Sequence, residues 1–120
     1  MGQVSDKIDI EAVLRGVGLK VVETVNPLDL TAAIDCVKRT AALPGVKAII
    51  FKSPCAALVK PKAPAVIDSN KCIKCKRCVS TLGCPGIAIR DGKMYIEPSL
   101  CVGCGLCAQI CPVGAIGGAA

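Results

Sequence analysis

Eight of the ten cysteines in this 120-residue chain fall in two runs with the same spacing, and this doubled run limits the possible folds most. In each run, two residues separate each of three successive cysteines, and a fourth cysteine follows with a proline behind it. The first run is Cys72, Cys75, Cys78 and Cys84, and the second is Cys101, Cys104, Cys107 and Cys111. Thiolates spaced so closely and regularly indicate a bound metal centre.

Disulfides, zinc and iron–sulfur clusters are the three kinds of cysteine chemistry to weigh. The first residues, MGQVSDKIDI, are charged and contain no apolar stretch, so we expect no signal peptide and a cytoplasmic protein. A reducing compartment disfavours disulfides. Zinc usually takes its thiolates as two C-x2-C pairs, which would leave a third cysteine of each run unused. The chain also has no histidine for a mixed zinc site. The pattern therefore favours iron–sulfur clusters.

The second run, C-x2-C-x2-C-x3-C-P, is typical of [4Fe–4S] ligation in bacterial ferredoxins, and the first run has two extra residues before its last cysteine. In two-cluster ferredoxins the fourth cysteine of each run serves the other cluster. Applied to this chain, that rule predicts two crossed ligand sets. The first cluster would take Cys72, Cys75, Cys78 and Cys111, and the second would take Cys101, Cys104, Cys107 and Cys84.

An internal repeat supports this prediction. The first three cysteines of one run match those of the other at an offset of 29 residues, and CPGIAI at 84–89 matches CPVGAI at 111–116. Each copy reads as a short strand, a ligand loop, a helical turn and a second short strand. Asp91-Gly92, between two short apolar runs, predicts a two-residue hairpin turn that joins the copies. The strands near 66–68 and 114–116 are expected to pair, giving an α+β ferredoxin domain with pseudo-twofold symmetry and two short hairpin-like sheets.

The first half of the chain has a different, α/β pattern. A helix is predicted from about Ile10 to Arg15, a strand over 20–25 and a second strand over 46–51, the latter buried on both faces. Between the strands, Asn26 is predicted as an N-cap with Pro27 at the first helical position. Strand, helix and strand in this order predict a parallel βαβ unit.

The helix of this unit should bury one apolar face. The residues that recur at helical spacing are Leu30, Ile34, Val37 and Ala41. Two strands alone make a weak parallel sheet, so we expect this half to be the end of a larger domain or to dock on a partner. The predicted organisation is an α/β segment over 1–60, a linker over 61–65 that overlaps the solvated KPKAP stretch at 60–64, and a ferredoxin domain over 66–120.

Four segments together resemble one family. They are VETVNPLDL at 22–30, SPCAAL at 53–58, CIKCKRCVSTLGCP at 72–85 and CVGCGLCAQICP at 101–112. In this order they resemble the C-terminal end of the α subunit of indolepyruvate:ferredoxin oxidoreductases, which are thiamine-dependent 2-oxoacid:ferredoxin oxidoreductases. The resemblance covers nearly the whole chain. It implies that residues 1–60 are a remnant of a thiamine-type α/β domain.

The resemblance also implies a function. Members of the family oxidatively decarboxylate arylpyruvates to acyl-CoA and pass the electrons through clusters to soluble ferredoxin. This chain departs from the family because it has no Gly-Asp-Gly followed by Asn, the motif that grips Mg²⁺ and thiamine diphosphate. Those cofactors would bind in an upstream part or in partner subunits, and the chain alone is not expected to be catalytic. A free-standing two-cluster ferredoxin and a structural zinc protein are the alternatives.

The charge of the chain bears on its partners. The formal net charge is +6, and two oxidised clusters with their thiolates would reduce it to about +2. Four cations, Lys71, Lys74, Lys76 and Arg77, surround the first run. They either raise the potential of that cluster and attract an acidic ferredoxin, or form an ordinary solvated loop. We expect no nucleic-acid partner, because basic residues are not interleaved with aromatics, and no membrane span.

The two remaining cysteines have no ligand spacing. Cys36 lies beside the apolar face of the predicted helix and is interpreted as a packing residue. Cys55 is interpreted as a buried structural thiol, with a redox-active or substrate-proximal thiol as the alternative. Gly83, Gly103 and Gly105 either let backbone amides approach the clusters or serve as plain turn residues.

Overall fold

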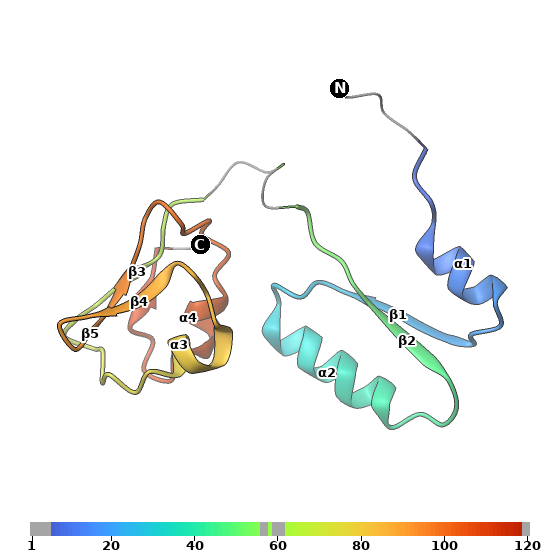
Figure 1. Cartoon of the computed structure of the whole chain (residues 1–120). Helices are drawn as coiled ribbons and strands as arrows, with labels where there is room; N and C mark the ends of the chain where they lie inside the picture. The colour runs from blue at the N-terminus through green and yellow to red at the C-terminus, as the bar shows by residue number, and fades with distance from the viewer. Residues whose placement is uncertain (1–5, 56–57, 59–61, 119–120) are drawn as a thin grey trace. The chain divides into compact units, whose positions relative to one another are not determined.

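The computed structural model describes residues 6–55, 58 and 62–118, and the chain divides into two compact units. Unit 1 is Met1–Ser53 and unit 2 is Pro54–Ala120. Figure 1 shows helices and strands in both units. The longest described helix has 12 residues, whereas about 20 are needed to cross a bilayer, and no candidate membrane span is found among the described residues.

Unit 1 confirms the predicted βαβ order. Its elements are α1 (Ile10–Gly16), β1 (Val21–Val25), α2 (Leu30–Ala41) and β2 (Lys47–Phe51). β1 and β2 pair in parallel, with Val21 opposite Lys47 and Val25 opposite Phe51. Helix α2 contacts both strands, so the crossover helix packs on the sheet that it connects.

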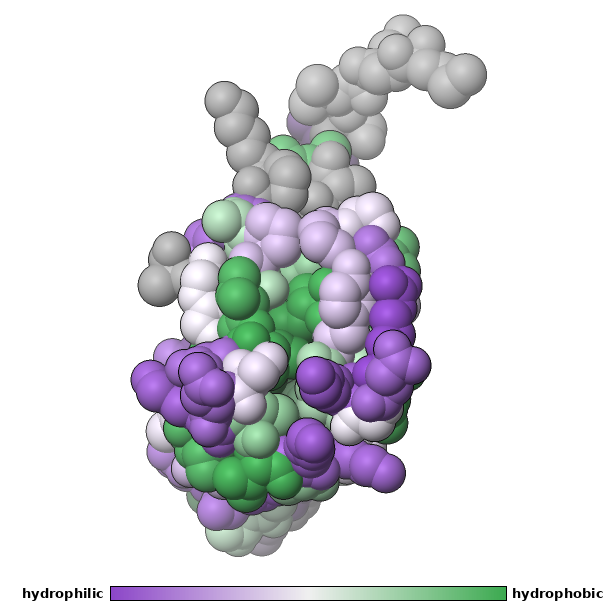
Figure 2. Space-filling model, turned by 90° about the vertical axis from the view of Figure 1, so that its left-hand side faces the viewer, coloured by the Kyte–Doolittle hydropathy of each residue, from purple (hydrophilic) through white to green (hydrophobic). Residues whose placement is uncertain are grey.

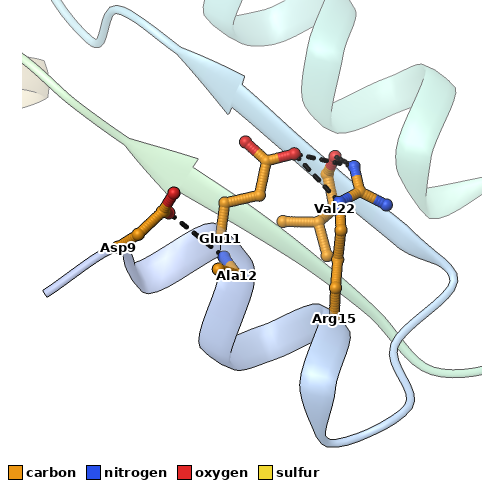
Figure 3. Close-up of polar contacts among 5 residues, drawn as sticks. All are labelled: Asp9, Glu11, Ala12, Arg15 and Val22. Carbon is orange, nitrogen blue, oxygen red and sulfur yellow. Dashed lines mark hydrogen bonds and ion pairs between the residues drawn. The ribbon is translucent and has the colours of Figure 1, made fainter.

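A hydrogen bond joins α1 to β1, and further polar contacts lie within α1 (Figure 3). Asp9 caps the helix by accepting a hydrogen bond from the Ala12 N–H at 3.1 Å. Glu11 pairs with Arg15 one turn later at 2.7 Å, and the same guanidinium reaches the carbonyl oxygen of Val22 in β1 at 3.4 Å. These groups are largely exposed, so they position α1 more than they stabilise it.

The start of α2 differs from the prediction. Asp29 is the N-cap, and its side chain accepts a hydrogen bond from the Ala32 N–H at 3.0 Å. Asn26 is not the N-cap, because its side chain accepts from the Leu28 N–H at 2.9 Å and thereby forms a turn that contains Pro27. Asn26 and Asp29 are both suitable N-cap residues, and the helix begins directly after the second of them.

The packing of unit 1 also differs from the prediction. The buried residues of α2 are Ala33, Cys36 and Thr40, whereas Ile34 and Val37 are 43% and 42% exposed. The small side chains face the two strands, and a sheet this narrow leaves the larger ones uncovered. For the same reason β2 is not buried on both faces, and Phe51 is 53% exposed. The packing role of Cys36, which is 3% exposed, is confirmed.

Unit 2 has the strand–loop–helix–strand order predicted for each copy. Its elements are β3 (Val66–Ile67), α3 (Arg77–Leu82), β4 (Ile87–Arg90), β5 (Lys93–Ile96), α4 (Leu106–Ile110) and β6 (Ile116–Gly117). β4 and β5 form an antiparallel hairpin, and the outer strands β3 and β6 pair with each other, as predicted. Asp91 and Gly92 turn the hairpin with φ values of 50° and 70°, the left-handed conformation of a type I′ turn.

Cysteines supply much of the core of unit 2. The buried residues that form its core cluster are Ala65, Cys78, Ile87, Met94, Ile96, Cys107 and Ile116. Four more cysteines pack against them partly buried, namely Cys72, Cys84, Cys101 and Cys111. Because this core has few large apolar side chains, we expect its stability to depend on what its thiols bind.

Candidate metal centre

Two cavities in unit 2 are each lined by four cysteines. The first contains Cys72, Cys75, Cys78 and Cys111. The second contains Cys84, Cys101, Cys104 and Cys107. Each cavity therefore gathers the three closely spaced cysteines of one run and the fourth cysteine of the other. Crossed ligation requires this grouping, and four soft thiolates per cavity suit a [4Fe–4S] cluster.

The two short helices explain why the fourth cysteines cross. Cys78 is the second residue of α3 and Cys107 the second residue of α4, so each helix starts inside its own ligand loop. Each helix then leads the chain to the fourth cysteine of its run. Cys84 follows the end of α3, and Cys111 is the C-cap of α4. Because α3 and α4 pack against each other, the end of one helix reaches the loop of the other.

Among the described residues, no three His, Cys, Asp or Glu side chains lie close enough to hold a single metal ion. Four thiolates around one zinc ion lie about 4 Å apart, because each Zn–S bond is about 2.3 Å long and the geometry is tetrahedral. A cubane gives each thiolate its own iron, so its ligands are spread further apart.

Burial and backbone hydrogen bonds act on the thiols in opposite directions. Burial raises the pKa of the Cys78 and Cys107 thiols. Burial also acts to raise the pKa of Cys111, but the backbone N–H groups of residues 113–116 outweigh it and lower that pKa below its ordinary value. The Ala115 N–H donates to Cys111 Sγ at 3.2 Å. A thiolate is the form that binds iron, so these N–H groups favour the ligating state.

Residues 62–65, which we call the strap, lie against the second ligand loop. The Lys62 N–H donates to the Val102 carbonyl oxygen at 3.3 Å, and the Ala65 N–H donates to Cys101 Sγ at 3.4 Å. Ala65 is 4% exposed. Sequence reasoning missed these contacts because they use backbone groups, and it treated this segment as a solvated linker; Lys60 and Pro61 of that segment lie outside the described residues.

Gly103 fits against the strap only because it lacks a side chain. Its φ is +67°, and a Cβ atom there would lie 2.7 Å from both the Ala63 carbonyl oxygen and Lys62 Cβ. Gly103 therefore allows a close approach of the backbone, and the segment that it approaches is the strap. Gly83 has a φ of +57° at the end of α3 with nothing within 4 Å, which is the plain turn role.

We predict that Gly103→Ala displaces the strap. The substitution should cost about 1–3 kcal/mol of stability through the overlap, and it should lower the reduction potential of the second cluster because the Ala65 bond to sulfur is lost. Gly92→Ala is the matched control, with a φ of +70° and open space around it. Denaturant midpoints and redox titration monitored by EPR compare the two variants; equal effects would contradict a role for the strap.

The two ligand loops share one backbone conformation with different residues. Gly103 and Gly105 have φ values of 67° and 80°, and the residues 29 positions earlier, Lys74 and Lys76, have φ values of 56° and 61°. A left-handed conformation costs a side-chain-bearing residue about 1–2 kcal/mol. The first loop therefore carries lysines where glycines would be unstrained.

Cys55 does not have the position expected of a structural thiol. It is exposed, and so are its neighbours from Lys52 to Pro54. The prediction of a buried thiol is wrong because the chain leaves β2 there without packing against an element. Ala56 and Ala57 of the SPCAAL segment lie outside the described residues.

Comparison with known proteins first establishes the class. The model of the 4Fe-4S binding domain family matches residues 94–117, and a second model with the same description matches residues 69–92. The matches coincide with the two copies of the repeat. Together with the short sheets of unit 2, they show that the chain contains a ferredoxin domain for two [4Fe–4S] clusters.

The particular relatives are subunits of 2-oxoacid oxidoreductases. The chain is 39% identical over 119 residues to the indolepyruvate oxidoreductase subunit IorA of Methanothermobacter thermautotrophicus. The aligned region covers 97% of this chain and 19% of the relative. It is 35% identical over 121 residues to IorA of Archaeoglobus fulgidus, again covering 19% of the relative. The pyruvate synthase subunit PorD of Methanothermobacter marburgensis is 46% identical over 50 residues, 42% of this chain and 58% of that relative.

These similarities confirm the resemblance inferred from the sequence. The chain is a relative of the indolepyruvate oxidoreductase subunit IorA and corresponds to a ferredoxin-containing part of it. It spans about a fifth of the length of the IorA subunits that it matches.

Proposed function

We propose that this chain transfers electrons within an indolepyruvate, or more broadly arylpyruvate, ferredoxin oxidoreductase that converts 2-oxoacids to acyl-CoA. The observation that carries the proposal is the pair of four-cysteine cavities in a chain related along 97% of its length to IorA subunits. When bound, [4Fe–4S] clusters supply one-electron transfer.

In this proposal the residues of unit 2 have distinct tasks. The eight thiolates hold the clusters in the crossed sets predicted from the sequence. Backbone N–H groups, such as that of Ala115, stabilise thiolate charge. Buried side chains such as Ile87 and Ile96, which line the second cavity, exclude water from it.

The remainder of the reaction belongs elsewhere in the proposed enzyme. The chain contains no Gly-Asp-Gly motif, so thiamine diphosphate and Mg²⁺ would bind in other domains or subunits. The βαβ fold of unit 1 supports the proposal that residues 1–60 complete a thiamine-type α/β domain, with 61–65 as the connection and 66–120 as the ferredoxin domain. The final acceptor would be a soluble ferredoxin in the cytoplasm.

A free-standing two-cluster ferredoxin is the less favoured candidate. The PorD relative matches only 42% of this chain, but the IorA relatives match unit 1 as well as unit 2. A simple carrier would not require a partner that covers the exposed apolar residues of unit 1, among them Ile34 and Val37.

Anaerobic purification of the tagged chain from its own cells tests the proposal. We expect a thiamine-binding polypeptide to co-purify, and we expect the complex to reduce viologen only with an arylpyruvate and coenzyme A present. A Cys104→Ser chain should retain the complex but transfer electrons poorly. If the chain purifies alone, and no such activity accompanies it, the oxidoreductase proposal is wrong.

A further inference from the structure

We propose that the first ligand loop is the surface at which this chain delivers electrons to an acidic carrier protein. Its basic collar, defined as Lys71, Lys74, Lys76 and Arg77, would bind that carrier. The inference rests on the proposed electron-transfer function. It goes further by assigning electron exit to one loop and by naming the residues that recognise the acceptor.

The charge of the two loops is the first observation. The collar places four cations within seven residues, and all four are exposed. Its repeat counterparts in the second loop are Leu100, Gly103, Gly105 and Leu106. The second loop therefore has the same backbone and no charge. Lys71 has an exposed ion pair with Asp68 at 3.9 Å, which is too weak to remove its charge from the surface.

Unit 2 as a whole also carries an excess of positive charge. Residues 54–120 contain eight Lys and Arg against three Asp and Glu, and Lys93 lines the same cavity as Lys74. Excess positive charge beside a ligand loop increases the rate of encounter with an acidic protein.

Backbone strain is the second, independent observation. Lys74 and Lys76 have φ values of 56° and 61°, and the second loop achieves the same conformation with glycine. Folding alone would be served better by glycine at both positions. The lysine side chains therefore have a role other than shaping the loop, and we infer that this role is to bind a partner protein.

Accessibility distinguishes the loops further. The strap packs on the second loop through Val102 and Gly103. The thiols do not distinguish the loops, because Cys75 and Cys104 are both exposed, but Ile73 in the first loop is 61% exposed whereas its counterpart Val102 is 44% exposed. An apolar centre with a charged rim is the usual composition of a protein interface. Figure 2 shows that hydrophobic and hydrophilic areas adjoin one another on the face that it displays.

The test measures electron transfer from the reduced, reconstituted full chain to an acidic plant-type [2Fe–2S] ferredoxin by stopped-flow absorbance. Each event oxidises the chain by one electron and reduces the probe by one. For Lys71→Gln/Lys74→Gln/Lys76→Gln we expect the second-order rate to fall about tenfold or more at about 0.01 M ionic strength. The difference from the unsubstituted chain should nearly vanish at high salt.

The control removes the same charge elsewhere. Lys7→Gln/Lys20→Gln/Lys52→Gln takes three exposed lysines from unit 1, and its rate should change less than about twofold. Equal losses in both variants, or a rate in the unsubstituted chain that does not depend on salt, would overturn the docking proposal. Iron content and the visible spectrum should be the same in all three chains. If the unsubstituted chain lacks clusters or cannot reduce the probe, the proposed function itself fails and this inference fails with it.

A second variant separates binding from folding. Lys74→Gly/Lys76→Gly gives the first loop the glycines of the second, so we expect a higher denaturant midpoint together with slower reduction of the acidic probe. Opposite signs in the two measurements cannot come from damage to the fold. An unchanged rate would show that the collar is only a solvated loop.

Discussion

Removal of iron should cost unit 2 its folded structure. Six of the eight run cysteines belong to its core or pack against it, and few large apolar side chains accompany them. Below about 70–80 residues a hydrophobic core rarely contributes more than about 3–5 kcal/mol, so the energy of metal binding becomes the energy of folding. After anaerobic treatment with acid and chelator, the amides of β4 and β5 should lose their slow hydrogen exchange.

Thiol labelling provides the control for this experiment. All eight run cysteines should react in the iron-free chain, whereas Cys36 in unit 1 should remain slow because it lies on the buried face of helix α2 and is 3% exposed. Retention of slow exchange in β4 and β5 without iron would show that unit 2 folds without bound metal, and it would contradict this prediction.

Crossed ligation makes a second prediction with a large effect, tested with pairs of substitutions. Cys75 and Cys111 line one cavity, so Cys75→Ser/Cys111→Ser should damage one cluster and leave about four of eight irons. Cys84 lines the other cavity, so Cys75→Ser/Cys84→Ser should damage both and leave almost none.

Ligation within each run predicts the reverse order of iron contents, because Cys75 and Cys84 would then share one cluster. Iron and sulfide analysis after anaerobic reconstitution distinguishes the two arrangements. Cys55→Ser is the control, since this exposed cysteine lines neither four-cysteine cavity, and it should leave the iron content unchanged.

The parts of the fold that the sequence predicted well are those where one residue type has one physical use. Asp91-Gly92 suits the left-handed turn of a tight hairpin, and that hairpin is present. The doubled cysteine spacing implied a doubled fold, and the pairing of β3 with β6 follows from closing the second copy against the first.

The errors arose where the outcome depends on a competition. Asn26 and Asp29 can each cap a helix, and only the hydrogen bonds of the folded chain decide between them. Burial in unit 1 depends on the size of its sheet. Helical periodicity predicted that the stripe with Ile34 and Val37 is buried, but the two-stranded sheet covers the adjacent stripe that contains Ala33 and Cys36.

Other features of the site leave almost no trace in the sequence. The bond from the Ala65 N–H to Cys101 uses a backbone group, which every residue except proline has. The strained lysines could have been found only by aligning the repeat, where Gly103 and Gly105 stand opposite Lys74 and Lys76.

A reductive titration of the reconstituted chain tests the central claim most directly. The account predicts about eight iron and eight sulfide per chain, and the uptake of about two electrons, one for each [4Fe–4S] cluster. Bound zinc, which has no redox chemistry, would take up none. Uptake of fewer than two electrons by a fully loaded chain would contradict the claim that the chain is a two-cluster electron-transfer domain.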